Sequence, residues 1–147
     1  MGGVRPYLSV EGPKTYEVDS AVKGGMIIQA KSNGKVEKAG AGSLLVLGVA
    51  ETDAKPYANP VSTDADGFET INLSPLPDHV AVGLGRYPVT YAANCGFGVL
   101  LKAAANGTVT PWVSGTDDAS LIIGKCDEPG GVVVATKAVG LAIIRGN

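Results

Sequence analysis

Residue types that could carry catalysis are sparse in this chain and do not fall at a recognised spacing. His79 is the only histidine, and no Gly-x-Ser-x-Gly nucleophile elbow is present for it to activate, so we expect it in a loop. The glycine-rich stretches 83–88 and 96–101 both lack the third glycine of a dinucleotide-binding fingerprint, and no G-x4-G-K-[ST] phosphate loop occurs. The sequence therefore predicts no enzymatic activity and no cofactor.

Candidate metal ligands and thiols are equally scattered. Cys95 and Cys126 are not in a CxxC spacing and have no histidine cluster beside them, which favours two small buried residues, although a disulfide between them stays open. "STDADG" (62–67) resembles the start of a calcium-binding loop, but Ser62 replaces its first Asp and Leu73 lies where the bidentate Glu belongs. We expect an Asp-Gly turn there, a solvated turn at Asp117-Asp118, and no metal site.

Charge and hydropathy exclude several classes of partner. The 147 residues include 12 basic and 14 acidic side chains, a net charge of −2, so nothing attracts the chain to nucleic acid or to an anionic membrane. The longest apolar runs, such as 44–50, are too short to cross a bilayer, and residues 1–10 lack the apolar core of a signal peptide. We expect no nucleic-acid partner, no membrane partner and synthesis in a cytoplasm.

The sequence contains an internal repeat, which defines the structural elements that would position any functional residues. "GMIIQAKSNGKVEKAG" (25–40) aligns with "GVLLKAAANGTVTPWV" (98–113) at a constant offset of 73. Further on, "LVLG" (45–48) parallels "LIIG" (121–124) at an offset of 76. Each unit predicts an apolar strand, an Asn-Gly turn at a two-residue hairpin tip, a second strand and a third strand that ends in glycine. A duplicated unit is the favoured interpretation, and convergent hairpin chemistry is the alternative.

The repeat predicts a mainly β fold. A further strand would close each half, at 79–89 for the first and at 139–146 for the second, and two such units would bury their apolar faces together as a small β-barrel or sandwich. The predicted division is an extended N-terminal arm over 1–17 and a single β domain over 18–147. That domain comprises half one (18–50), a long loop insert (51–78) with one strand at 68–73, and half two (79–147).

Two further features bear on contacts. Trp112 is the only tryptophan, and we weigh core packing against a role as an intersubunit anchor. The arm carries Val4, Tyr7 and Leu8, apolar groups that are costly to leave in water, with Arg5 among them.

The pattern "VKGGMIIQA…NGKVEKAGAGSLLVLGVAETDA", followed by "VTYAANCGFGVLLKAAANGTVTPWV…SLIIGKCDEPGGV", resembles head decoration (capsid cement) proteins of tailed bacteriophages. The resemblance covers roughly 18–145 and brings no catalytic residues with it. It implies a compact β domain, a homotrimer, bound outside a phage capsid where it bridges major capsid protein subunits. The arm fits such a contact through Val4, Arg5, Tyr7 and Leu8, whereas the insert 51–78 has no counterpart that we can place.

Two other classes of function remain open from the sequence. A stand-alone β-sandwich binding module, for instance one for host-surface glycans, is the runner-up, and a neighbouring reading frame for a major capsid protein would discriminate against it. An enzyme would require a cleft in which catalytic side chains converge, and the sequence does not indicate one.

Overall fold

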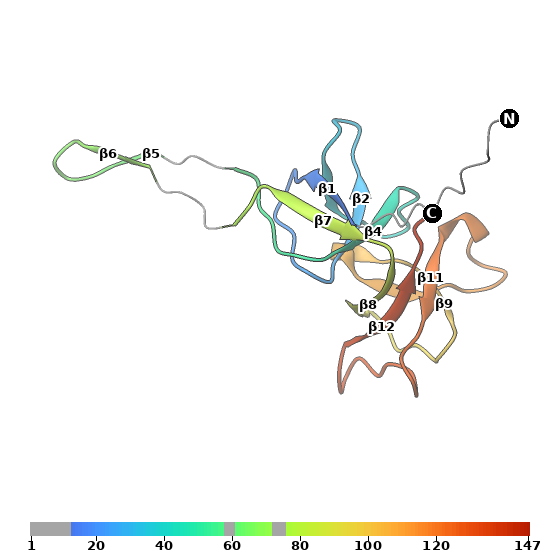
Figure 1. The fold of residues 1–147 in the computed structure, drawn as a ribbon. Coiled ribbons are helices and arrows are strands. Elements are labelled where there is room, and N and C mark those ends of the chain that lie inside the picture. Colours follow the sequence, from blue (N-terminus) through green and yellow to red (C-terminus); the bar gives the residue numbers. More distant parts are fainter. Residues whose placement is uncertain (1–12, 58–60, 72–75) are drawn as a thin grey trace, which may run out of the picture.

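The computed structural model describes residues 13–57, 61–71 and 76–147, which form short antiparallel strands and two 3-10 turns (Figure 1). The earlier strands are β1 (Lys14–Glu17), β2 (Ile27–Ala30), β3 (Val36–Lys38), β4 (Val46–Ala50), β5 (Val61–Thr63), β6 (Glu69–Ile71) and β7 (His79–Gly83). The later strands are β8 (Gly85–Thr90), β9 (Leu100–Ala103), β10 (Val109–Pro111), β11 (Ile122–Cys126) and β12 (Val139–Ile144). The 3-10 turns are η1 (Ala105–Gly107) and η2 (Ala119–Leu121).

Ten of these strands form two five-stranded antiparallel sheets. The first sheet has the order β1-β7-β4-β2-β3 and the second, read from the corresponding edge, β8-β12-β11-β9-β10. The two orders match strand for strand, and the sheets stay separate instead of closing into one barrel. The mainly β prediction is confirmed, in its sandwich form with two similar halves.

The strand registers show that the halves are equivalent residue by residue. Ile28 pairs with Gly48 in the first sheet and Leu101 with Gly124 in the second, and both ladders shift register next to the glycine. These pairs reproduce the predicted offsets of 73 and 76. The agreement extends past the aligned segments, because the bond from the Val22 amide to the Ala54 carbonyl (2.8 Å) recurs between Cys95 and Val132 (3.0 Å).

Both Asn-Gly pairs lie at hairpin tips, but the predicted two-residue loops are wrong. The flanking pairs are Ala30↔Val36 and Ala103↔Val109, which leaves five-residue loops over 31–35 and 104–108. Local bonds stabilise these longer loops. The first and last loop residues are bonded at 2.9 Å in one hairpin and 2.8 Å in the other, and the side chain of Asn33 accepts from the Lys35 amide at 3.0 Å.

The element boundaries also differ from those predicted. β7 lies in the first sheet beside β4, so the second half begins after it, at β8, and not at residue 79. Residues 14–17 of the predicted arm form β1, an edge strand paired with β7. The alternation of apolar and polar residues does not predict this strand, because β1 begins and ends with charged side chains, Lys14 and Glu17.

Each half has an inner sheet face that packs on its own loops. In the first half the inner face bears Ile28, Ala50 and Val82, which form a closed core with Val18, Val22 and Ala54. The opposite, outer face of the first sheet bears Ile27, Val46 and Val49, and these pack into the core of the second half. The first sheet is therefore buried on both faces.

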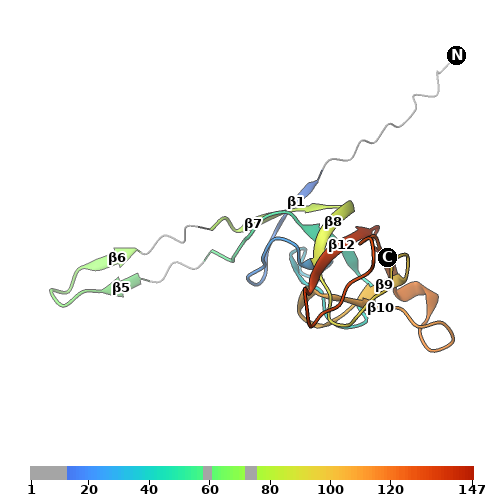
Figure 2. The same cartoon turned by 90° about the horizontal axis from the view of Figure 1, so that it is seen from below.

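The predicted insert contains a two-stranded hairpin, β5–β6, instead of a single strand. It stands apart from the two sheets in both views (Figures 1 and 2). Its turn is made by Asp64, whose carboxylate accepts from the amides of Asp66 (3.0 Å) and Phe68 (2.9 Å). This bonding confirms the expected turn in "STDADG" and gives the Asp64 carboxylate the turn-forming role.

Candidate interaction surfaces

Among the described residues, the titratable side chains singled out in the sequence do not come together in one site. His79 is the exposed first residue of β7, not a loop residue, and its Nδ1 lies 2.7 Å from a carboxylate oxygen of Asp78. This contact lowers the pKa of Asp78. Among the described residues, no group of three or more His, Cys, Asp or Glu side chains could hold a metal ion.

The two cysteines are buried free thiols in the core of the second half. Burial and the neighbouring Cys126 raise the pKa of Cys95 above its ordinary value, so its thiolate is scarce at neutral pH. Tyr91 lies in the same core and donates to the carbonyl of Leu141 at 2.8 Å. Burial, followed by Cys126, raises its pKa as well. This cluster packs the core and offers no accessible nucleophile.

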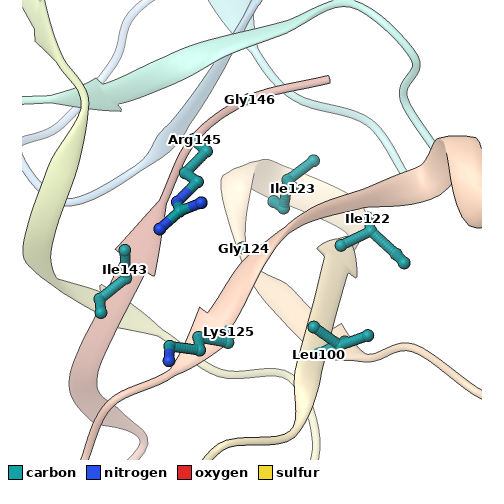
Figure 3. A pocket seen from close by; sticks show the side chains of 8 residues that line it. All are labelled: Leu100, Ile122, Ile123, Gly124, Lys125, Ile143, Arg145 and Gly146. Carbon is teal, nitrogen blue, oxygen red and sulfur yellow. The ribbon is translucent and has the colours of Figure 1, made fainter.

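The most distinctive surface is a shallow apolar groove on the outer face of the second sheet. It has a volume of about 340 Å³. The lining comprises Leu100, Ile122, Ile123, Gly124, Lys125, Ile143, Arg145 and Gly146. In Figure 3, Leu100 and Ile122 project from adjacent strands on one side, with Ile143 across the groove and two basic side chains beside them.

The groove occupies positions that are buried in the other half. Leu100 is 38% exposed, whereas its equivalent Ile27 is 0% exposed. Lys125 is exposed, whereas its equivalent Val49 is fully buried. The same outer face therefore forms a packed interface in the first half and an open surface in the second. Ile27-Ile28 and Leu100-Leu101 are equally apolar, so the signal in the sequence for this difference is the Lys125 that stands in place of Val49.

Trp112 is half-buried instead of lying in the core. Its backbone amide donates to Leu100 (2.8 Å) just as Ala39 donates to Ile27 (2.8 Å), so Trp112 and Ala39 are equivalent. Ala39 is 1% exposed within the contact between the halves. The indole Nε1 of Trp112 donates to the carbonyl of Asp118 at 2.9 Å, which orients the ring.

The arm residues Val4, Arg5, Tyr7 and Leu8 lie outside the described residues. Across the part of the chain that is described, no helix has the length and hydropathy needed to cross a membrane.

These features define the class of protein: a duplicated antiparallel β-sandwich with an exposed apolar face and no assembled catalytic group among the described residues. The sequence matches no protein-family model and no curated protein.

Among solved structures, three from bacteriophage phi29 share the fold. The head fiber gp8.5 N base is 18% identical with a TM-score of 0.52, over 89% of this chain and 91% of that one. The C-terminal fragment of gene product 12 is 17% identical with a TM-score of 0.53, over 93% and 100% of the two chains. The pre-mature gene product 12 is 16% identical with a TM-score of 0.57, over 92% of this chain. This chain spans about a fifth (21%) of that longer protein.

Proposed function

We propose that this protein is a structural component of a phage virion that binds the outside of the capsid and stabilises it by bridging major capsid protein subunits. The observation that carries the proposal is the fold shared with the N base of a phage head fiber over nearly the whole of both chains. The capsid-decoration resemblance of the sequence points to the same location independently.

The described structure is consistent with a binding role. A sandwich with few charges, two well-packed cores and an exposed apolar face is suited to rigid attachment. Many copies on a symmetric shell would add avidity, so each individual contact can be modest. We propose that residues 1–13, which precede β1, supply part of the capsid contact through Val4, Arg5, Tyr7 and Leu8.

The test compares capsids of the corresponding phage with and without added protein, by electron microscopy and by thermal release of the genome. We expect density on the capsid exterior and a higher release temperature when the protein is bound. Purified protein that leaves capsids bare at saturating concentration would exclude the proposed function.

A variant of the protein tests the arm separately. Replacing Tyr7 and Leu8 by Ser should lower capsid occupancy, because it removes apolar area from the contact. Replacing the exposed Val133 by Ser is the matched control and should leave occupancy unchanged. Equal occupancy for the arm variant and the control would remove the arm from the proposal while leaving capsid binding in place.

One observation favours the runner-up, a binding module for another surface such as a host glycan. The fold occurs as about a fifth of a longer chain, gene product 12, and modules of that size are often carried by larger proteins. Binding to a host-cell glycan array by protein that ignores capsids would support this alternative.

A further inference from the structure

The apolar groove on the second sheet carries two cationic side chains, Lys125 and Arg145, and both are exposed. Among the residues that the structure describes, neither of them forms an ion pair. Asp127 lies two residues beyond Lys125 on the chain, but its carboxylate already pairs with Arg86. The groove therefore offers positive charge to a ligand from outside the described part of the chain.

Strand pairing sets the spacing of these two cations. Lys125 lies directly opposite Ile143 in the ladder between β11 and β12. Arg145 follows Ile143 by two residues, so it is a diagonal neighbour of Lys125, at roughly 7–8 Å. Its backbone is held in place, because the Arg145 amide donates to the Ile123 carbonyl at 2.7 Å. In Figure 3 both basic side chains lie beside Ile143 at the groove. The two charges are thus carried at a defined separation by paired backbone.

The rest of the groove is apolar and shallow. Leu100 and Ile122 line it, and Gly124 adds no side chain to its floor (Figure 3). The strands that form it, β9, β11 and β12, each have a neighbouring strand on both sides. No free strand edge is therefore available here for a partner to extend the sheet through main-chain hydrogen bonds. A partner must bind this groove through its side chains.

The equivalent face of the first half indicates what those side chains must supply. Ile27 and Val49 are covered there by the apolar core of the second half. In the second half Leu100 keeps the apolar character of Ile27, whereas Lys125 replaces Val49. A purely apolar partner would cover the ammonium group of Lys125 without giving it a counter-charge, which is costly. A suitable partner presents carboxylates together with apolar groups.

We propose that this groove binds an acidic, extended peptide segment of another protein, with one carboxylate on Lys125, a second on Arg145 and apolar side chains against Leu100 and Ile122. In an extended peptide, side chains two residues apart point to the same side at roughly 6.4–6.8 Å, close to the separation of the two cations. The guanidinium of Arg145 has the planar fork that binds a carboxylate through two hydrogen bonds. The ion pairs would set the register of the peptide, and the apolar contacts would add affinity.

Other anionic partners fit the groove less well. Two basic side chains make a small footprint for a nucleic acid, which is bound through many phosphate contacts, and the chain has a net charge of −2. The apolar lining has no use in such a contact. An anionic membrane surface is likewise bound by larger basic clusters than this pair.

The test titrates the isotope-labelled full chain with a synthetic heptapeptide and follows the backbone amide signals by NMR. The probe has two glutamates separated by one serine and flanked on each side by two leucines. We expect saturable shifts at Leu100, Lys125 and Arg145. The Kd should rise about fivefold or more for the matched peptide in which glutamine replaces both glutamates. Added salt should weaken binding of the glutamate peptide and leave the glutamine peptide nearly unaffected.

Variants of the protein locate the site. Lys125→Gln combined with Arg145→Gln should bind both peptides equally weakly, because no cation remains for the carboxylates. Lys23→Gln combined with Lys38→Gln removes the same charge from exposed positions of the first half, and this matched control should bind like the native protein.

Three results would each overturn the proposal: no saturable shift at the groove, equal affinity for the glutamate and glutamine peptides, or native affinity in the groove variant. Binding at the groove by a DNA oligonucleotide or by vesicles of anionic lipid, in place of the peptide, would overturn it as well. The titration uses no capsid, so a negative result would leave the proposed virion function standing.

Discussion

Gly124 occupies a position where two backbones approach too closely for a side chain. A Cβ built there would overlap the carbonyl oxygen of Ile143 on the neighbouring strand β12. Gly48 meets the same constraint in the first half, against the carbonyl of Gly83. A glycine repeated at equivalent positions therefore reports backbone packing at a register shift in both sheets.

Replacing Gly124 by Ala should lower the free energy of unfolding by about 1–3 kcal/mol, because β11 and β12 must move apart to admit the methyl group. Urea denaturation followed by intrinsic fluorescence measures the change. Gly40→Ala is the control, since nothing lies within 4 Å of its added Cβ. A Gly124 variant as stable as the Gly40 variant would contradict the close approach.

Asp117 anchors the loop before β11. Its side chain is 11% exposed and pairs with Lys102 Nζ at 2.6 Å. It also accepts from the Val113 amide at 2.8 Å, and the two contacts, led by Lys102, lower its pKa below the ordinary value of 3.8. A lowered folded-state pKa means that the contribution to stability is present above the unfolded-state pKa and is lost as the pH falls through the folded-state pKa.

Asp117→Asn should therefore have a lower melting temperature than the native protein at pH 7. In strong acid the melting temperatures of the two proteins should become nearly equal. Thermal melts from pH 7 down to pH 2.5 test this expectation. A difference between the two proteins that stays constant across the range would show that the charge of Asp117 is not what stabilises the loop.

At the scale of elements, the sequence predicts the hairpins and the glycine-ended strands because the equivalent residues are alike in type. It does not predict that β1 and β8 are equivalent, since Lys14-Thr15-Tyr16 and Tyr87-Pro88-Val89 share no residue. Both strands are sheet edges, where side-chain type is weakly constrained. Burial of the outer face depends on how the halves dock, and the local sign in the sequence that this face is exposed in the second half is Lys125 in place of Val49.

The β5–β6 hairpin is an element that the sandwich does not need. Its strands pair only with each other, and the chain closes beneath it through a 2.9 Å bond from the Lys55 amide to the Pro77 carbonyl. Replacing residues 57–75 by a short Gly-Ser linker should leave the melting temperature nearly unchanged. A cooperative loss of structure on circular dichroism would instead show that the hairpin supports the sheets.

At the scale of the whole molecule, stability depends on the contact between the halves. Val49 lies at the centre of this contact with 0% exposure. Its equivalent in the second half is the exposed Lys125, so two residues of opposite character occupy the same position of the duplicated unit. The difference follows from whether that position is covered.

Val49→Lys should destabilise the protein by about 3–5 kcal/mol, because it leaves an unpaired charge between the halves. The reciprocal change, Lys125→Val, should leave folding intact, since that position is exposed. Denaturant titration of both variants checks the pair. Equal effects of the two substitutions would mean that the halves are not packed as described.

The closed core of the first half has a consequence for synthesis. All of its buried residues lie between Val18 and Val82, so this core is complete before the second half leaves the ribosome. The nascent first half can then fold early and present Ile27, Val46 and Val49 as a ready surface. The second half, whose core is continuous with those side chains, would fold against them. The order of translation would therefore give a symmetric duplication an asymmetric folding pathway, in which the C-terminal half folds against the already folded N-terminal half.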